Sequence, residues 1–174
     1  MIDHKKLNQF LKKAEKHLEG EWVIIGGTVL PILGSDHRTT VDIDIVSLKE
    51  SNNQNQQSMK LMKIAEEIGL PVEAINQAGA FYLRKIKDFQ DNLILITESK
   101  NLKIYRPNAL LFFELKAARM SESDLLDCLE FIRVNPLEIE KYRNGIRSTL
   151  KKFLSNSKLN PDAISRLQEL FEEI

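Results

Sequence analysis

The sequence predicts an α/β (α+β) fold, in which a small mixed sheet flanked by helices is followed by a helical C-terminal part. Two observations lead to this prediction. Up to about residue 106, segments with helical spacing alternate with short β-branched runs, whereas residues 107–174 show helical spacing only. We therefore expect an α/β core at 1–106 and a helical region at 107–174 packed on it, or one continuous domain.

The first part of the chain is expected to supply all the strands. Helices are predicted at 4–19, 28–33 and about 57–68, and strands at 22–25, 41–46, 93–97 and 102–105. Gly26-Gly27 interrupts the first β-branched run, and a polar, exposed loop is expected at 49–58. The stretch 69–83 is punctuated by proline and glycine and has no clear assignment. In the helix at about 57–68, the expected apolar face comprises Met59, Met62, Ala65 and Ile68, widened by Leu61 and Ile64.

The second part is expected to consist of helices, at about 107–120, 121–133, 137–154 and 161–173. Pro107 is placed at the opening of the first, strongly apolar helix, where a missing N–H costs little. Ser121 followed by Asp124 resembles a capping box with Asp in place of Glu, which would begin the second helix. Cys128 lies in an apolar run of that helix, and we expect a buried, structural thiol there.

The composition excludes several classes of function. Lys plus Arg equals Asp plus Glu at 25 each, so no global charge draws the chain to nucleic acid or membranes, and a polyanion would need a local basic patch. The single cysteine excludes a disulfide framework and a cysteine-based metal cluster. No apolar stretch approaches the ~20 residues of a membrane span, and the amphipathic start has no signal-peptide core, so a cytoplasmic location is expected.

Two aspartates alternate with apolar residues in the strand predicted at 41–46. Because side chains alternate between the faces of a strand, Asp42 and Asp44 are expected on one face and their apolar neighbours on the other. Two anions at that separation repel each other unless a cation lies between them. A hard divalent cation such as Mg²⁺ or Mn²⁺, completed by water and phosphate oxygens, meets that need. A lone Asp-x-Asp is also typical of the solvated face of an edge strand.

A glycine pair precedes the aspartates. Gly26-Gly27 follows a predicted strand and begins a short helix, where the backbone can approach a phosphate closely and direct N–H groups at it. Thr28 adds a hydroxyl donor at the same place. A Gly-Gly alone is common in turns. Combined with the two carboxylates, it favours phosphoryl transfer, in which catalysis is mostly positioning and charge neutralisation.

The segment GGTVLPILGSDHRTTVDIDIV resembles the signature of the DNA polymerase β-type nucleotidyltransferase superfamily. That signature has Gly-Gly or Gly-Ser at a helix start, then a spacer, then Asp-x-Asp or Asp-x-Glu on a strand. More narrowly, the segment is similar to the nucleotidyltransferase toxins of type IV toxin–antitoxin and abortive-infection systems, in which Arg-x-Thr/Ser-x-Asp-x-Asp follows the glycine turn. Arg38, Thr40, Asp42 and Asp44 occupy these positions.

A second segment, FELKAARMSESDLLDCLEF, matches a helix of the same branch that reads roughly leucine–lysine–x–alanine and precedes two spaced aspartates. Lys116, Asp124 and Asp127 stand at these positions, and the resemblance covers about residues 20–133. It implies that Lys116 contacts nucleotide phosphates and that one downstream aspartate is needed for activity. Asp124 and Asp127 are expected to share a helix face, so either one fits.

The resemblance implies a nucleotidyltransferase-like sheet and an Mg²⁺- or Mn²⁺-dependent enzyme that takes a nucleoside triphosphate as substrate. The residues implied to bind nucleotide are Gly26, Gly27, Thr28, Arg38 and Lys116, those implied to bind metal are Asp42 and Asp44, and those implied in catalysis also include Lys116, Asp124 and Asp127. The acceptor would be an RNA, such as the 3′ end of a tRNA, or a protein hydroxyl. In a toxin–antitoxin pair, an antitoxin would be a further partner.

The sequence departs from the superfamily pattern in one respect. Many members place a third carboxylate on a later strand, but the predicted strands LILIT and LKIYR contain no acid. Either Asp124 or Asp127 substitutes for it, or the site holds one metal, or catalysis has been lost. The alternative function is therefore that of a catalytically inactive member, which binds a nucleotide or a partner protein without turnover.

Some of the basic residues also have structural interpretations. Lys116 is either functional or a lysine that reaches from an apolar helix to solvent. Arg38 suits a phosphate or carboxylate clamp, or a simple salt bridge within its loop. Arg143, Arg147 and Lys151 line one stripe of a predicted helix, where a solvated face is favoured over an RNA-contacting patch.

Overall fold

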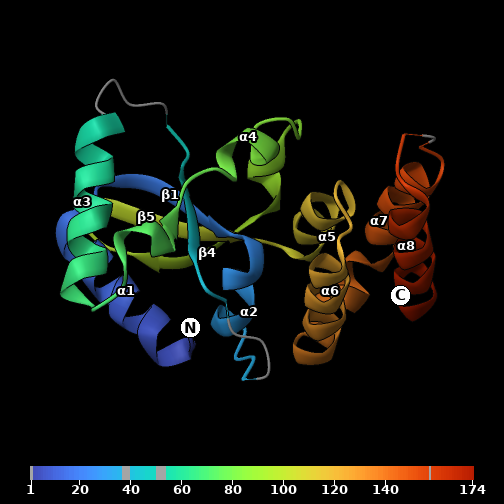
Figure 1. Ribbon diagram of the computed structural model, residues 1–174, viewed down its shortest axis with the longest axis horizontal. Helices are drawn as coiled ribbons and strands as arrows, with labels where there is room; N and C mark the ends of the chain where they lie inside the picture. The colour runs from blue at the N-terminus through green and yellow to red at the C-terminus, as the bar shows by residue number, and fades with distance from the viewer. Residues whose placement is uncertain (1, 37–39, 50–53, 157) are drawn as a thin grey trace. The chain divides into compact units, whose positions relative to one another are not determined.

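The computed structural model describes residues 2–36, 40–49, 54–156 and 158–174. The chain divides into two compact units, Met1–Pro107 and Asn108–Ile174, which we call unit 1 and unit 2. Unit 1 contains the strands and unit 2 is helical, so the mixed α/β fold with a helical C-terminal part is confirmed (Figure 1). Each unit is described by itself below.

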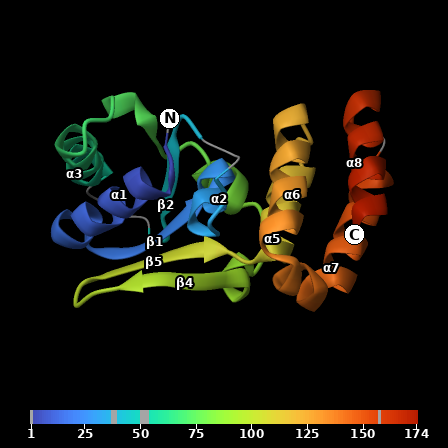
Figure 2. The ribbon, with the colours of Figure 1, turned by 90° about the horizontal axis from the view of Figure 1, so that it is seen from below.

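Unit 1 is built on a mixed five-stranded sheet with the strand order β3-β2-β1-β5-β4 (Figure 2). The strands are β1 (Gly20–Ile25), β2 (Ile43–Ser47), β3 (Ile75–Asn76), β4 (Leu93–Glu98) and β5 (Leu102–Pro107). β1 runs antiparallel to β2 and parallel to β5, β3 is parallel to β2, and β4 is antiparallel to β5. β1 is therefore the central strand, which explains why its apolar run is buried on both faces.

Helices cover one face of this sheet. Unit 1 contains the helices α1 (His4–His17), α2 (Val29–Ile32), α3 (Gln54–Glu67) and α4 (Ala80–Leu83), and the 3₁₀ turns η1 (Gly26–Thr28), η2 (Val72–Ala74) and η3 (Phe89–Asn92). α1 and α3 contact each other and lie on the same side of the strands (Figures 1 and 2). The apolar core between helices and sheet includes Phe10, Trp22, Ile24, Ile43, Ile45, Ile64 and Ile104.

The strand register places Asp44 on the other face of the sheet. Ile43 and Ile45 of β2 belong to the core beneath α1 and α3. Since strand residues alternate between faces, Asp44 points away from that core. It lies opposite Ile25, the last residue of β1, in the antiparallel β1–β2 pair. The buried isoleucines therefore determine which face carries the carboxylate.

Unit 2 consists, in the described residues, of the helices α5 (Ala109–Ala117), α6 (Glu122–Val134), α7 (Pro136–Leu154) and α8 (Pro161–Glu173), which pack side by side (Figure 1). Phe112 and Phe113 of α5 meet Phe131 of α6, with ring centroids 4.8 and 5.9 Å from the Phe131 ring. The capping box predicted at the start of α6 is confirmed, because Ser121 and Asp124 bond reciprocally to each other's N–H groups.

Two predicted boundaries were wrong. Pro107 ends β5 instead of opening a helix, and Asn108 caps α5 by accepting a hydrogen bond from a main-chain N–H of the first turn. The strand predicted at 41–46 begins only at Ile43, and Val41 is 72% exposed. Pro107 still pairs with Leu93 in the β4–β5 ladder, whereas Val41 precedes the first residue of β2.

Helix α3 differs from its prediction in length and in orientation. It includes Gln54 and the residues after it, which were expected to belong to the polar loop at 49–58. Met59 and Met62 are 69% and 50% exposed and face solvent. The buried stripe consists of Leu61, Ile64, Ala65 and Ile68. Glutamine has a favourable helix propensity, so a run of polar residues does not by itself indicate a loop.

Two further features of the structure concern the thiol and the apolar character of the helices. Cys128 is fully buried in α6, as predicted. Within the part of the chain that the structure describes, no helix combines the length and the apolar character needed to cross a membrane.

Truncation of Phe10 should destabilise unit 1 much more than truncation of Phe81. Phe10 is fully buried in the core, whereas Phe81 on α4 is 62% exposed. We expect Phe10→Ala to cost about 3–5 kcal/mol and Phe81→Ala at most about 0.5 kcal/mol. Urea denaturation followed by circular dichroism measures both, and equal losses would contradict the assignment of the core.

Candidate functional site

The glycine turn and one of the predicted carboxylates meet where β1 ends. Gly26 has a φ of +66°, a backbone conformation that favours glycine. A Cβ at this position would collide with the carboxylate of Asp44. Asp44 is half-buried and lies opposite Ile25 in β1 and opposite Asn76 in β3. The structure thus brings the main chain of Gly26 against the carboxylate of Asp44.

Thr28 connects the glycine turn to the aspartate segment. It is fully buried, and its hydroxyl donates to the carbonyl oxygen of Asp42 at 3.0 Å and accepts from the N–H of Asp44 at 3.2 Å. Thr40 donates a second hydrogen bond to the same carbonyl oxygen, also at 3.0 Å. A hydroxyl has one proton to donate. Thr28 therefore uses its proton inside the fold, and the geometry favours a positioning role over direct contact with a phosphate.

Asp42 is placed differently from the prediction. It lies in the bend that precedes β2, so strand alternation, the basis for expecting both carboxylates on one face, does not apply to it. It is half-buried, and both Thr28 and Thr40 hold its main-chain carbonyl. Gly27 belongs to the turn η1. Arg38, predicted to bind nucleotide, lies outside the described residues.

In chemical type, Asp42 and Asp44 match the ligands that a magnesium ion prefers. Mg²⁺ is usually held by one or two carboxylates, with waters and substrate phosphates completing its octahedron. The main chain of the glycine turn lies directly against Asp44, so a phosphate held by this turn would lie close to the carboxylate. Among the described residues, no group of three or more Asp, Glu, His or Cys is arranged to hold a metal. β4 extends one residue beyond the predicted strand and ends in an acid, Glu98, whose side chain pairs with Lys103 at 3.3 Å.

The second predicted motif forms a buried ion cluster in unit 2. The Nζ of Lys116 lies 3.1 Å from Asp124 Oδ1 and 2.6 Å from Asp127 Oδ2. Arg119 donates two hydrogen bonds to Asp124, of 2.7 and 2.6 Å. Lys116 is 7% exposed, so it is not a lysine that reaches to solvent. Both carboxylates bind the same ammonium group, which shows that Asp124 and Asp127 share a helix face, as predicted.

The charges in this cluster stabilise one another. Burial disfavours the charged form of Lys116, but Asp127 and Asp124 outweigh this effect and raise the pKa of Lys116 above its ordinary value. Burial also opposes ionisation of Asp124, yet hydrogen bonds from Arg119 and Ser121 and the charge of Lys116 hold its pKa well below the usual range. Burial raises the pKa of Cys128 and keeps it a neutral thiol. Lys116 and Asp124 therefore stay charged at neutral pH.

The basic stripe on α7 has structural partners. Arg143 donates to Glu140 and to the main-chain carbonyl of Ile174. The guanidinium of Arg147 lies 4.1 Å from the centre of the Phe171 ring on α8, and Lys151 lies 5.8 Å from the same ring. These contacts hold α7 and α8 together. Arg143 and Lys151 are exposed, as expected of a solvated face, whereas Arg147 is half-buried and packs on α8.

Two residues near the predicted motifs were not identified from the sequence. Asn76 pairs with Asp44 across β2 and β3, and its side chain accepts from the N–H of Ala78 at 2.8 Å. β3 is only two residues long, which is too short for an alternation signal. Arg119 was also missed, and its only signal was its position between Lys116 and the capping box.

One family model matches almost the whole chain. It is described as a nucleotidyltransferase of unknown function (DUF6036), and it covers residues 3–168. The match includes the glycine turn and both aspartates of unit 1 and the ion cluster of unit 2. No curated protein and no solved structure matches the chain.

Replacement of Gly26 by alanine should cost more stability than the same change at Gly69. Both glycines have nearly the same positive φ, +66° and +67°, but a Cβ meets Asp44 at the first and open space at the second. Both variants bear the left-handed strain, and Gly26→Ala should lose about 1–3 kcal/mol more because of the collision. Chemical denaturation of the two variants measures the difference, and equal losses would contradict the close approach.

Removal of the Asp124 charge should destabilise unit 2 in a pH-dependent manner. The pKa of Asp124 is lower in the folded protein than its ordinary value of 3.8, so its ionisation stabilises the fold above pH 3.8, and this contribution is lost as the pH falls further. Asp124→Asn should therefore cost about 3 kcal/mol at pH 7 and progressively less below pH 4. Urea denaturation at a series of pH values provides the measurement.

The exposed pair of Glu140 and Arg143 supplies the control for this series. Their side chains are 68% and 44% exposed, and the Glu140–Arg143 distance is 2.6 Å. Glu140→Gln should change stability by less than about 1 kcal/mol at any of these pH values. A cost of Asp124→Asn that does not vary with pH would show that the charge of Asp124 is not what stabilises the cluster.

Proposed function

The chain belongs to the family of nucleotidyltransferases of unknown function, DUF6036, and we propose that it is an active, metal-dependent member. In this proposal it moves a nucleotidyl group from a nucleoside triphosphate to a hydroxyl of an acceptor. The oxygen of the acceptor hydroxyl attacks the α-phosphorus, the bond from that phosphorus to the bridging oxygen breaks, and pyrophosphate leaves. The proton of the hydroxyl passes to a base.

The contact between Gly26 and Asp44 carries the proposal. A metal-binding carboxylate and a phosphate-binding turn must be adjacent, because the metal and the turn act on oxygens of the same triphosphate. Asp44 lies so close to Gly26 that no side chain fits between them. Thr28 fixes this arrangement through its two main-chain hydrogen bonds. An isolated Asp-x-Asp on a solvated edge strand would not need such a constraint.

Residues of unit 1 take the following roles in the proposal. Asp42 and Asp44 would hold Mg²⁺ or Mn²⁺, and Gly26 and Gly27 would bind phosphate oxygens through main-chain N–H groups. When bound, the cation supplies neutralisation of the charge that develops on the phosphate oxygens. Thr28 positions the two carboxylates through the main chain. Arg38 is retained as a nucleotide-binding residue on the resemblance alone.

The ion cluster of unit 2 enters the proposal through the resemblance to the toxin branch. Lys116 would act on the phosphates, and one aspartate would act on the acceptor side or complete the metal site. Either Asp124 or Asp127 could take this role, since Lys116 binds both carboxylates.

The acceptor and the biological context are proposed on the same resemblance. The acceptor would be an RNA, such as the 3′ end of a tRNA, or a protein hydroxyl. The context would be a toxin–antitoxin pair, in which the transfer reaction disables the acceptor and an antitoxin opposes the enzyme. The Arg-x-Thr-x-Asp-x-Asp spacing at 38–44 supports this narrower assignment.

Asp44→Asn should abolish nucleotidyl transfer and leave the fold intact, because the amide keeps the shape of the side chain but loses its charge. The assay incubates the protein with each α-³²P-labelled nucleoside triphosphate, Mg²⁺, total RNA and total protein, and resolves the labelled products on gels. EDTA should remove the activity of the wild type. A loss of activity of more than about 100-fold is expected for a residue that binds the catalytic cation.

Asp91→Asn is the matched control, since Asp91 is an exposed aspartate of η3 in the same unit. It should transfer label at the wild-type rate. Full activity in a folded Asp44→Asn protein would refute the mechanism. Binding of a nucleoside triphosphate without any labelled product would instead support the alternative, a catalytically inactive member that binds nucleotide.

A further inference from the structure

Helix α4 of unit 1 presents aromatic and basic side chains for which the proposed chemistry has no use. Phe81 and Tyr82 are 62% and 53% exposed, although both are large and aromatic. The cations Arg84, Lys85 and Lys87 follow directly and are also exposed. Scattered exposed apolar residues are ordinary, but a contiguous exposed aromatic surface usually marks a binding site. We call these five residues the α4 patch.

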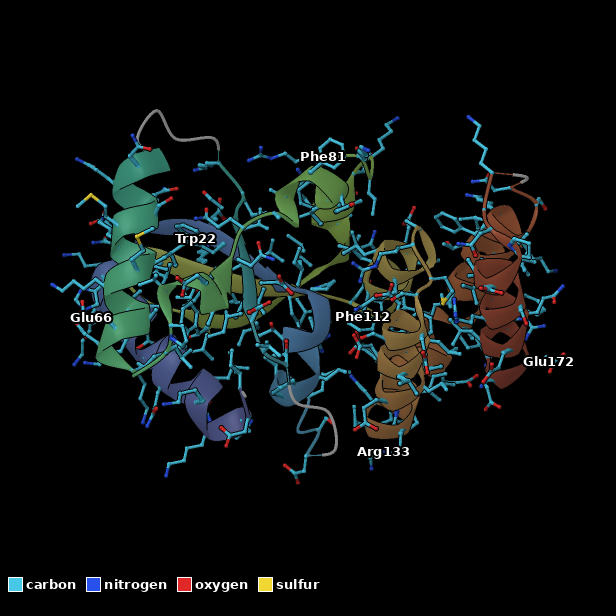
Figure 3. All side chains as sticks on the ribbon, viewed as in Figure 1. Trp22, Glu66, Phe81, Phe112, Arg133 and Glu172 are labelled. Atoms are coloured by element: carbon cyan, nitrogen blue, oxygen red, sulfur yellow. The ribbon has the colours of Figure 1, made fainter. Side chains whose placement is uncertain are left out.

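The α4 patch is presented by ordered main chain. Leu83, which follows the two aromatic residues, is fully buried and anchors the helix. The N–H groups of Leu83 and Arg84 donate to the carbonyls of Gly79 and Ala80, each at 3.1 Å. Figure 3 shows Phe81 on the side of α4 that faces away from the strands of unit 1. The main chain therefore already presents the rings to solvent. Little additional conformational entropy of the main chain is lost when a ligand binds.

The ring geometry suits flat ligands with a phosphate attached. Phe81 and Tyr82 meet edge to face, with centroids 5.5 Å apart and an interplanar angle of 83°. The ammonium of Lys85 lies 3.7 Å from the centre of the Phe81 ring. Since Phe81 remains mostly exposed despite this cation, part of its surface is accessible for stacking. A nucleobase stacked there would have a positive charge beside its phosphate.

The patch is also a local positive region in a chain whose formal net charge is zero. Residues 80–88 contain three cations and one carboxylate, Asp88, which gives a net charge of +2. The pairing of Lys87 with Asp88 is loose, at 3.9 Å between side chains that are 92% and 70% exposed. Such a pair contributes little and does not prevent Lys87 from binding another anion. This is the local basic patch that a polyanion requires.

The position of α4 connects the patch to the candidate site of the same unit. Asn76, which pairs with Asp44, is separated from the first residue of α4 by three residues. Gly79, directly before α4, packs so closely on the side chain of Ile25 that a Cβ would collide with it. Ile25 is the residue before Gly26. The α4 patch thus begins near the end of β1 at which the glycine turn and Asp44 lie.

We propose that the α4 patch binds single-stranded nucleic acid, with bases stacked on Phe81 and Tyr82 and phosphates bound by Arg84, Lys85 and Lys87. Aromatic platforms with adjacent cations bind single strands without strong sequence preference, because every base has a flat face. The combination favours a polynucleotide over a protein, because the rings match flat bases and the cations match a repeated phosphate backbone. The inference deepens the proposed function, on which it rests, by naming the acceptor as a polynucleotide.

Fluorescence anisotropy tests the patch without any turnover. The probe is a fluorescein-labelled single-stranded RNA of ten nucleotides with a free 3′-hydroxyl, titrated with protein in Mg²⁺ and no nucleotide. Single-stranded DNA and the RNA duplex of the same sequence are run beside it. The wild type should bind both single strands more tightly than the duplex. Phe81→Ala/Tyr82→Ala should weaken binding about tenfold or more.

The salt dependence of Kd distinguishes the contribution of the cations to RNA binding from that of the aromatic rings. For single strands, the slope of log Kd against log salt should fall by about 0.7 for each phosphate contact removed. Arg84→Ala/Lys85→Ala should lower the slope, whereas Tyr82→Phe/Phe81→Trp should keep both the slope and the affinity. The matched control is Met62→Ala/Lys63→Ala, an exposed apolar and basic pair on α3, which should bind like the wild type.

The result that would overturn the inference is a wild type that binds no single strand, or binds the duplex equally well. Unchanged binding by a folded Phe81→Ala/Tyr82→Ala protein would also overturn it. Asp44→Asn distinguishes this failure from failure of the proposed function. Patch-dependent binding that persists in Asp44→Asn supports the inference even if no transfer occurs. Asp44-dependent transfer to protein, with no effect of the patch variants, supports the enzyme and refutes the patch.

Discussion

The close approach of Gly26 to the carboxylate of Asp44 is the constraint on which the candidate site depends. It requires a residue without Cβ at a positive φ, directly after the buried central strand. It also requires Asp44 to stand in register with the last residue of β1. Thr28 links the two features, because its buried hydroxyl joins the glycine turn to the main chain on either side of Ile43. Strand pairing, turn and carboxylate therefore depend on one another.

The aspartates of the two candidate motifs have different surroundings. In unit 1, Asp42 and Asp44 are half-buried beside main chain. In unit 2, Lys116 and Arg119 neutralise Asp124 and Asp127 within the fold. Buried ions are tolerated only when paired and hydrogen-bonded, since removal of one partner leaves an uncompensated charge. In our proposal the first arrangement holds a cation. The second stabilises the packing of α5 against α6, whatever further role Lys116 has.

Prediction from the sequence succeeded where a local pattern controls the structure. The capping box of Ser121 and Asp124 was recognisable because it depends on residues three apart in the chain. The burial of Cys128 followed from its apolar surroundings. Prediction failed where partners are distant. Asn76 lies in a strand of two residues, which exists only because β2 pairs with it. The outward position of Met59 and Met62 depends on which side of α3 meets α1 and the sheet.

The sequence by itself determined the fold class, the glycine turn, the aspartates and the lysine motif, because these are written in residue types at short spacings. Only the tertiary structure decided that Gly26 touches Asp44, that Thr28 uses its hydroxyl inside the fold, and that Lys116 is buried between two aspartates. It also decided that Phe81 and Tyr82 face solvent while Leu83 does not. The physical reason is common to all of these features. Which side of an element is buried, and which groups meet, depends on segments far apart in the chain that pack against it.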